Sequence, residues 1–296
     1  MVKIAVAGFG EVSREIIKAV LVEGHHDITV LSRKDAPLDL PPGLSWAKID
    51  YQDKRQLVDT LKGVHTVLSF IVVQQDPGSV SQINLIDACV AAGVTRYFVN
   101  NFPMYEGKLQ VLEYCLFVPG VFMNYLAPLK KIGADIAFVQ LFVDFENCRA
   151  VVPEDPEGHD STVSFTTIQG VARVVTKALD YEGEWPVRGG ISASKTSISD
   201  LLQLGEMIRG KPFSIERIKK ADLQANNFTM SWAPTTNHPA VPVEQRELAA
   251  KDFMRIILMG LADGVLDMSN EWNQRLPDLE LTTLGSFLRD AWGTAE

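Results

Sequence analysis

Val2-Lys-Ile-Ala-Val-Ala-Gly8-Phe-Gly10-Glu-Val-Ser13 is the stretch from which the fold can be predicted. Its first half is a short apolar run that is typical of a buried strand and ends at Gly8. A helical pattern with apolar residues on one face follows over 12–23. Strand, glycine turn and helix in this order are the context of a dinucleotide-binding G-x-G-x-x-G motif. Ser13 replaces the third glycine and is small enough for close packing of helix on strand.

The residues of this turn have separate predicted roles. Gly8 allows the tight turn, and Gly10 lets the backbone approach a pyrophosphate at the helix N-terminus. We expect Phe9, Glu11 and Val12 beside the same ligand. Glu11 departs from the motif, because a carboxylate near a phosphate is unfavourable unless it points away. The alternative is a plain glycine turn that binds nothing.

Strand-like and helical patterns alternate along the chain. The expected strands are 27–31, 44–49, 64–70, 95–99, 113–118, 137–145, 149–152 and 212–217. The expected helices are 12–23, 53–62, 79–92, 166–179, 196–209 and 243–260, with a loop at 224–242. The alternation predicts an α/β fold with a Rossmann-type, doubly wound parallel sheet. We place a soft boundary after residue 150, so that 1–150 form an NAD(P)-binding domain and 151–296 a smaller, interleaved α+β substrate lobe.

Arg33 and Lys34 follow the second predicted strand. An NAD enzyme would have a carboxylate here for the ribose hydroxyls, whereas arginine suits a 2′-phosphate. This favours NADP(H) over NAD, with Arg33 binding the phosphate and Lys34 adding charge. The alternative is a solvated basic turn.

Two further strand ends border the expected cofactor, because ligands lie beyond the carboxyl ends of strands in doubly wound sheets. Phe70, Ile71 and Gln74 follow one of these strands, and Asn100 and Asn101 follow the next. The two asparagines could reach a ribose or a carboxamide, but asparagine is equally common in turns.

The sequence resembles the NmrA-like and isoflavone-reductase-like family of atypical short-chain dehydrogenases. The resemblance is carried by the glycine turn with Arg33 and by the stretches 82–98, 117–125, 163–168 and 195–211. It implies a Rossmann domain that binds NADP(H), a small lobe that closes a substrate cleft, and Pro119, Gly120 and Phe122 on the nicotinamide side.

A set of aromatic and apolar side chains is expected around this cleft. We expect Phe122, Met123, Tyr125 and Trp232 to contact a substrate, and Phe228 is a further candidate. The alternative is that they are core residues, which is the more frequent role of buried aromatics.

The resemblance fails after the fifth strand. Family reductases carry a lysine on the following helix, but here only 100–111 separate two strand-like runs. Lys108 is the candidate proton donor, with Tyr105 three positions away on the same helical face. The alternative is a solvated lysine on a shortened loop.

Composition excludes several classes of protein. With 28 basic and 37 acidic residues among 296, the net charge of −9 gives no basic surface for nucleic acid or an anionic membrane. The three cysteines form no disulfide framework, which fits a reducing, cytoplasmic setting. The histidines show no ligand spacing, so we predict no metal site. No apolar run is long enough to cross a membrane.

These observations favour an NADPH-dependent reductase of a small aromatic or secondary-metabolite-like substrate. One alternative is an NmrA-like protein that senses NADP(H) and signals to a protein partner without catalysis. Another is an enzyme that keeps the cofactor as a scaffold for cyclisation or condensation, with Glu106 or Glu113 as its acid or base.

Overall fold

A computed structural model describes residues 1–72, 75–99, 112–132, 136–154, 160–239 and 241–293. The chain divides into two compact units that alternate along the sequence. Unit 1 comprises Met1–Val118, Val171–Ile191 and Asn270–Leu279, and unit 2 comprises Pro119–Gly170, Ser192–Ser269 and Glu280–Glu296. The boundary predicted after residue 150 falls inside the first segment of unit 2.

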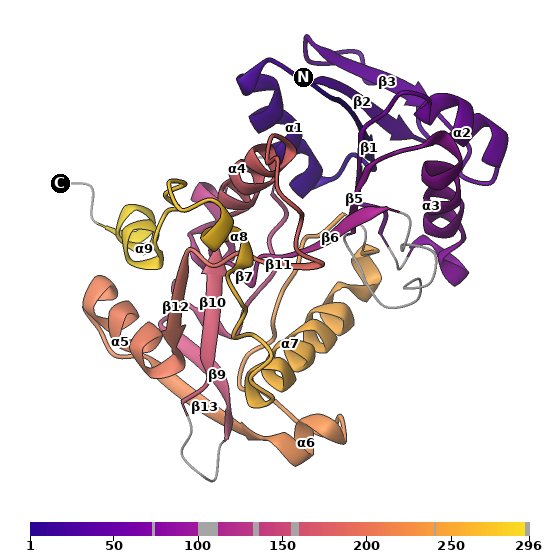
Figure 1. The fold of residues 1–296 in the computed structure, drawn as a ribbon. Helices are drawn as coiled ribbons and strands as arrows, with labels where there is room; N and C mark the ends of the chain where they lie inside the picture. Colours follow the sequence, from indigo (N-terminus) through magenta and orange to yellow (C-terminus); the bar gives the residue numbers. More distant parts are fainter. Residues whose placement is uncertain (73–74, 100–111, 133–135, 155–159, 240, 294–296) are drawn as a thin grey trace. The chain divides into compact units, whose positions relative to one another are not determined.

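Unit 1 is built on a seven-stranded sheet in which every pairing is parallel (Figure 1). Across the sheet the strands are β11 (Arg188–Gly190), β6 (Glu113–Val118), β5 (Arg96–Val99), β4 (Thr66–Ser69), β1 (Lys3–Ala7), β2 (Asp27–Ser32) and β3 (Leu44–Lys48). The predicted parallel sheet is confirmed. The β5–β6 pairing is also parallel, although few residues connect these strands.

Helices cover both faces of this sheet. In Figure 1, α2 (Lys54–Leu61) and α3 (Val80–Ala92) lie on one side, and α1 (Glu11–Glu23) and α4 (Ile168–Leu179) lie on the other. Ile4 to Ala7 of β1 are each at most 2% exposed. Burial on both faces explains why the strands are continuous apolar runs rather than alternating ones.

A row of neighbouring aromatic rings runs through unit 1. Ring centroids are 4.8 Å apart between Phe70 and Phe98, 4.8 Å between Phe98 and Phe117, and 5.0 Å between Phe117 and Trp272. Trp272 belongs to α8 (Glu271–Arg275) and is fully buried. A Cβ on Gly189 would collide with its indole ring, so β11 needs glycine there. A segment near the end of the chain therefore completes the core of unit 1.

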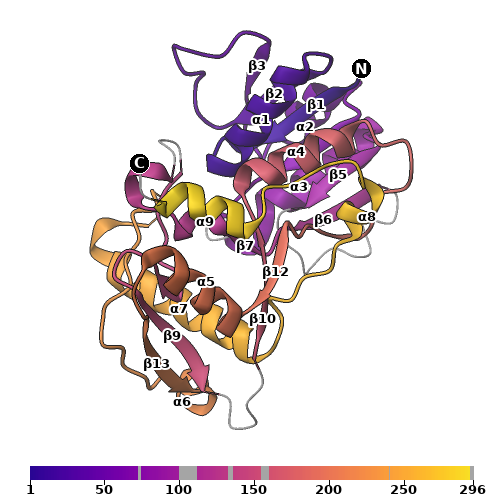
Figure 2. The same cartoon turned by 90° about the vertical axis from the view of Figure 1, so that its left-hand side faces the viewer.

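Unit 2 holds two small sheets and several helices (Figure 2). One sheet has the order β12 (Ser194–Ser197), β10 (Thr162–Thr166), β7 (Val121–Phe122); the other is β13 (Ser214–Lys219), β9 (Arg149–Glu154), β8 (Val143–Asp144). The helices are α5 (Ile198–Arg209), α6 (Lys220–Gln224), α7 (Arg246–Ala262) and α9 (Leu284–Trp292). They enclose one core with the inner faces of both sheets.

The predictions for unit 2 need correction. The strand expected over 137–145 is wrong in extent, since only β8 is regular and Val139 forms an isolated bridge with Thr236. Leu141, Phe142, Val143 and Phe145 are all buried, so this apolar run reflects burial in a core rather than a long strand. Residues 243–245 form a 3-10 turn before α7. The elements that were not predicted are β7, β10, β12, α6 and α9 in unit 2, and β11 and α8 in unit 1.

None of the helices in the described ranges combines the length and apolar character that crossing a bilayer requires.

Candidate cofactor site

The turn between β1 and α1 depends on Gly8. Its φ of +100° is unfavourable for other residues, and an added Cβ would stand 2.9 Å from the carbonyl oxygen of Phe70. The Gly8 N–H donates to the Leu31 carbonyl over 3.3 Å. The fold itself therefore requires glycine at this position.

Gly10 differs from Gly8. It caps α1 with φ −100°, which any residue adopts, and an added Cβ would meet nothing within 4 Å. The packing of the protein gives no reason for glycine here. What the position offers is open space in front of the first turn of α1, whose N–H groups have no partner within the helix. This is the arrangement in which a helix N-terminus binds an anion.

Ser13 has a structural role that the motif did not predict. Its Oγ accepts a hydrogen bond from the Gly10 N–H over 2.8 Å and donates to the Gly10 carbonyl over 3.0 Å. Ser13 is 1% exposed. The serine in place of the third glycine thus fixes the start of α1 while remaining small enough to be buried. Glu11 is the first residue of this helix, where its dipole favours a carboxylate.

The stretch after β4 lies beside the glycine turn. β1 pairs with β4 on one side and β2 on the other, and the Phe70 N–H donates to the Ala7 carbonyl over 2.7 Å. The order in which the chain adds strands reverses between β1 and β4, since β2 and β3 lie to one side of β1 and β4, β5 and β6 to the other. Doubly wound sheets bind ligands at such a point. Ile71 is half-buried next to Phe70. Gln74 lies outside the described residues.

Arg33 and Lys34 form an exposed turn after β2 that is held near the glycine turn. The Trp46 indole donates to the Lys34 carbonyl over 2.9 Å, and the same ring contacts Phe9 edge-on, with centroids 5.3 Å apart. Within the described part of the chain no ion pair uses Arg33 or Lys34, while Lys48 pairs with Asp35 over 2.7 Å. The positive charges of Arg33 and Lys34 are thus available to an anionic ligand.

The predicted substrate residues belong to unit 2 and differ in exposure. Phe122 and Tyr125 are half-buried, and their rings meet edge-on at 6.1 Å. Met123 is fully buried in the core, so its side chain contacts protein. Trp232 is 8% exposed and has the guanidinium of Arg149 4.5 Å from its ring centre. Phe228, 7% exposed, is likewise a core residue.

Pro119 and Gly120 directly follow β6. Gly120 has φ +67°, and a Cβ there would collide with the Ser164 carbonyl of β10. This glycine is required for the close approach of β7 to β10, whatever else the stretch does.

Of the residues predicted to act as acid or base, the structure describes only Glu113. Tyr105, Glu106 and Lys108 lie outside the described residues, as do Asn100 and Asn101. Glu113 is the first residue of β6, at the edge of the sheet opposite to the carboxyl ends. Its Oε2 accepts a hydrogen bond from Arg96 Nε over 2.7 Å, and its Oε1 accepts one from the backbone N–H of Trp185 over 2.6 Å. Both oxygens are used in unit 1, so Glu113 is a structural residue rather than a catalytic acid.

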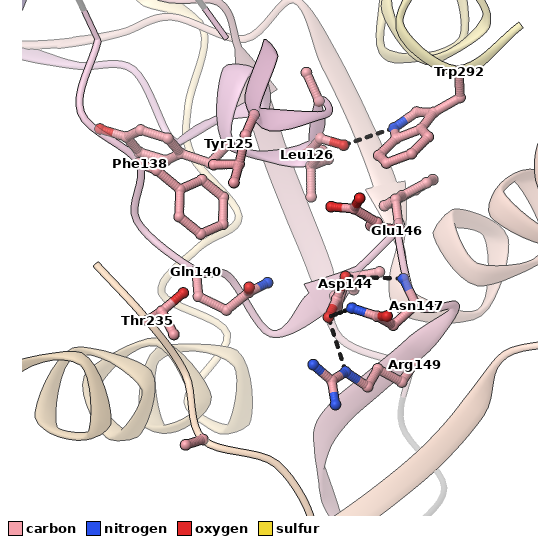
Figure 3. A pocket seen from close by; sticks show the side chains of 15 residues that line it. Tyr125, Leu126, Phe138, Gln140, Asp144, Glu146, Asn147, Arg149, Thr235 and Trp292 are labelled. Atoms are coloured by element: carbon pink, nitrogen blue, oxygen red, sulfur yellow. Dashed lines mark hydrogen bonds and ion pairs between the residues drawn. The ribbon is translucent and has the colours of Figure 1, made fainter. Parts of the chain in front are cut away.

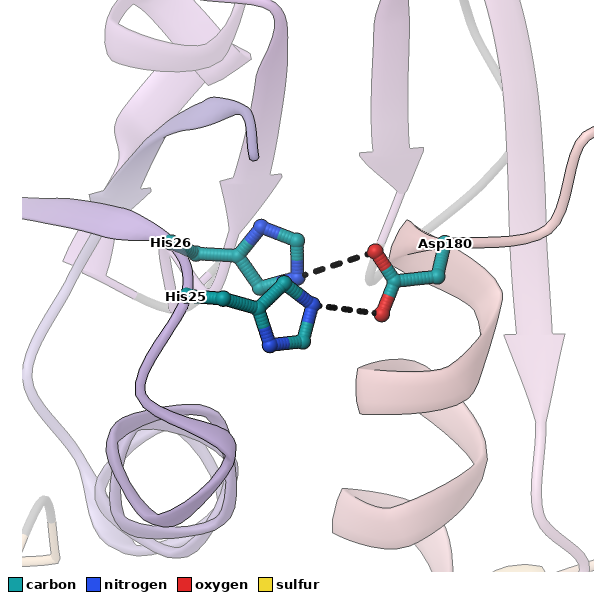
Figure 4. A group of neighbouring side chains, drawn as sticks. All are labelled: His25, His26 and Asp180. Atoms are coloured by element: carbon teal, nitrogen blue, oxygen red, sulfur yellow. Dashed lines mark hydrogen bonds and ion pairs between the residues drawn. The ribbon is translucent and has the colours of Figure 1, made fainter.

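One group of possible metal ligands in the described ranges was not predicted, because its members are far apart in the sequence. His25 Nε2 lies 2.8 Å and His26 Nε2 3.3 Å from the two oxygens of Asp180, which follows α4 (Figure 4). His25 Nδ1 is 3.2 Å from the Glu23 carbonyl, and His26 Nδ1 accepts from the Val2 N–H over 3.3 Å.

This pattern fits protons better than a metal ion. The Glu23 carbonyl and then the Asp180 carboxylate raise the pKa of His25, which favours an imidazolium. Burial lowers the pKa of His26, whose acceptor Nδ1 leaves the proton on Nε2, facing Asp180. His25 Nε2 then donates to one oxygen of Asp180, while His26 Nε2 lies 3.3 Å from the other oxygen without the geometry of a hydrogen bond. The group ties the end of α1 to the end of α4.

Comparison with known proteins finds a family similarity in the first part of the chain. Residues 8–115 match the model of an NAD(P)H-binding protein family. No curated protein matches the sequence.

Solved structures match nearly the whole chain. AtPrR2 with NADP+ and (+)-pinoresinol has a TM-score of 0.70 at 18% identity, covering 98% of each chain. Isoflavone reductase has a TM-score of 0.68 at 16% identity, covering 97% of this chain and 98% of that one. Triphenylmethane reductase of Citrobacter sp., complexed with NADP(H), has a TM-score of 0.67 at 15% identity, covering 97% and 99%.

At sequence identities this low, structural similarity establishes the fold alone. The resemblance predicted from the sequence is confirmed at the level of the fold. Residues 8–115 are therefore similar to an NAD(P)H-binding family, and the chain has the same fold as isoflavone reductase.

Proposed function

We propose that this protein is an NADPH-dependent reductase of a small aromatic or secondary-metabolite-like molecule. The observation that carries the proposal is the contrast between Gly8, which the fold requires, and Gly10, which it does not. A glycine that packing does not explain, in front of a helix N-terminus, is best explained by a bound phosphate.

The residues of unit 1 fit a dinucleotide phosphate. The pyrophosphate would lie at Gly10 and the first turn of α1, bordered by Phe9, Val12, Phe70 and Ile71. The exposed turn of Arg33 and Lys34 would bind the 2′-phosphate, which supports NADPH over NADH. The bound cofactor would supply hydride, and the chain would hold it in place and exclude water around it.

The substrate class rests on the structural relatives. Pinoresinol, isoflavones and triphenylmethane dyes, named for those proteins, are all aromatic. The half-buried rings of Phe122 and Tyr125 would suit such a molecule, and Lys108 is the proposed proton donor. Because Cys89, Cys115 and Cys148 are all unpaired and buried, we also propose a reducing, cytoplasmic setting.

The first experiment is a titration of the protein with NADPH and NADH, followed by fluorescence or calorimetry. Gly10→Ala should leave the thermal midpoint unchanged but weaken NADPH binding about tenfold or more, because the methyl group enters the space of the phosphate. Absence of NADPH binding to the unaltered protein would remove the basis of the proposal.

Arg33→Gln tests the choice between the two cofactors. It should weaken NADPH binding about tenfold while NADH binding changes little, since only NADPH has the 2′-phosphate. Arg55→Gln is the matched control, because Arg55 is an exposed arginine on α2 whose loss changes the net charge equally. Equal effects of both substitutions would refute a specific phosphate contact.

Turnover separates the reductase from the alternatives. NADPH consumption with a panel of enones, quinones and imines should be measurable and should fall in Lys108→Ala more than in Lys130→Ala, an exposed lysine elsewhere. Binding of NADPH without consumption would refute the reductase and favour a sensor. A product formed without NADPH consumption would favour a cofactor scaffold.

A further inference from the structure

Unit 2 contains a pocket of its own, separate from the glycine turn. Its volume is about 200 Å³, and its walls come from the 3-10 turn Met123–Leu126, the stretch 138–147, the start of β9, residues 233–235 and the end of α9 (Figure 3). The rings of Tyr125, Phe138 and Trp292 line it. Cavities of about 150 Å³ admit benzene, so this volume suits a molecule with one aromatic ring.

Arg149 gives the pocket fixed hydrogen-bond donors. Its Nε donates to Asp144 Oδ2 over 2.8 Å, and its guanidinium lies over the Trp232 ring. Two contacts on one planar group restrict its orientation before any ligand binds. Hydrogen bonds among the described residues do not use its terminal nitrogens, and the side chain is 34% exposed. These N–H groups are therefore available to an acceptor oxygen.

Both carboxylate oxygens of Asp144 accept hydrogen bonds from protein groups. Besides Arg149 it accepts from the Asn147 backbone N–H over 3.1 Å and from Asn147 Nδ2 over 2.8 Å. It is 5% exposed, and its charge compensates that of Arg149. The pair supplies directional donors to the pocket without a net positive charge.

Acceptor groups lie in the same hollow. The Gln140 backbone N–H donates to the Thr235 carbonyl over 2.9 Å and fixes this residue in place. Among the residues that the structure describes, its side-chain Nε2 makes one long contact of 3.4 Å, with the Leu141 carbonyl. In Figure 3 the Gln140 amide and the Glu146 carboxylate point into the same space. Their oxygens can accept N–H donors from a ligand.

The charged groups around the pocket discriminate between anionic, cationic and neutral ligands of similar size. Glu146 adds a negative charge to the compensated Asp144–Arg149 pair, and Arg209 offsets it, since its guanidinium lies 4.3 Å from the Trp292 ring centre and donates to the Glu146 carbonyl over 3.4 Å. The surroundings of the pocket thus carry no net positive charge that would favour a carboxylate ligand. The donors of Arg149 disfavour an ammonium group. A neutral group with both an acceptor oxygen and an N–H donor matches both sides. We propose that this pocket binds a single-ring, uncharged aromatic carboxamide, independently of the reductase function proposed above.

The test compares three probes of nearly equal size but different charge: benzamide, benzoate and benzylamine. Each is titrated into the full chain by ligand-observed NMR and calorimetry. Benzamide should bind with a Kd of about 1 mM or tighter, and the two charged probes at least about fivefold more weakly. Absence of benzamide binding, or tightest binding of either charged probe, would overturn the proposal.

Substitutions assign the binding to this pocket. Arg149→Lys keeps the charge beside Asp144 but loses the planar donors, and it should weaken benzamide binding about tenfold. Arg217→Lys, at an exposed position of β13, is the matched control and should have no effect. If Arg149→Lys lowers the thermal midpoint, Gln140→Leu replaces it, with exposed Gln203→Leu on α5 as control. Unchanged binding in both pocket variants would refute the site.

Benzamide resembles nicotinamide, so competition must be measured as well. Saturating NADP+ should leave benzamide binding unchanged, and so should Gly10→Ala. Displacement of benzamide by NADP+ would place it at the cofactor and overturn the proposal, while the reductase proposal would stand. Conversely, benzamide binding to a protein that fails to bind NADPH would refute the reductase and leave this site intact.

Discussion

The two units reach a packed core in opposite ways. In unit 1, six of the seven strands come from Met1–Val118, and the helices between them cover the sheet. In unit 2, β7 pairs with β10 and β9 with β13, partners that lie 40 or more positions apart. Unit 1 is nearly assembled from neighbours in sequence, and unit 2 is assembled from distant segments. Single long-range contacts should therefore matter more in unit 2, with one exception in unit 1.

That exception gives the largest expected effect. Trp272→Ala should destabilise unit 1 by about 4 kcal/mol, because a fully buried ring stacked on Phe117 is lost and leaves a cavity. Hydrogen exchange of peptides from β5 and β6 would report the loss. Gln274→Ala, at an exposed position of the same helix, is the control. Unchanged protection of β5 and β6 would show that residues 270–279 are accessory to unit 1.

Gly120→Ala is the corresponding test of unit 2. The new Cβ would collide with the Ser164 backbone at a φ of +67°, which should cost about 3 kcal/mol and expose β7 and β10 to exchange. Gly210→Ala separates strain from collision, because Gly210 has φ +68° but nothing within 4 Å. It should cost only about 1 kcal/mol. Equal costs would mean that β7 can move away from β10.

The same difference explains what the sequence could predict. The strands and helices of 1–99 repeat a local pattern, and their types follow from the periods of apolar residues. The glycine turn and Arg33 could be found because the site is formed by residues at strand ends. The apolar run at 137–145 misled the prediction, since its residues are buried in a core that distant segments supply.

Other parts of the molecule carry no local signal. The pairing of His25 and His26 with Asp180 joins positions 155 and 154 residues apart. The pocket around Arg149 is formed from four separate stretches of unit 2. Ser13 is the instructive intermediate case. Its size was predicted to matter, but its two hydrogen bonds to Gly10 required the geometry.

A smaller long-range effect is expected at the start of α4. The Asn124 Oδ1 accepts from the Ile168 N–H over 2.8 Å, and its Nδ2 donates to Gln169 Oε1 over 3.0 Å. Asn124→Ala should cost about 1.5 kcal/mol, measured by urea unfolding, because a buried helix N–H loses its acceptor. Asn124→Asp keeps that acceptor and should recover part of the loss. A loss of equal size in both variants would assign the effect to Gln169.

The smallest effect is in unit 1 and depends on pH. The pKa of His25 is raised in the folded state, so its contribution to stability is present below its ordinary value and is lost as pH rises through the folded value. His26 has a lowered pKa and acts in the opposite sense, since protonation at acid pH disfavours its buried ring. His25→Gln should therefore destabilise the protein at pH 5.5 and match the unaltered chain at pH 8.5, in urea unfolding at both values. A constant difference across this range would show that His25 is held by hydrogen bonds of a neutral imidazole, and α1 would then be joined to α4 without an imidazolium.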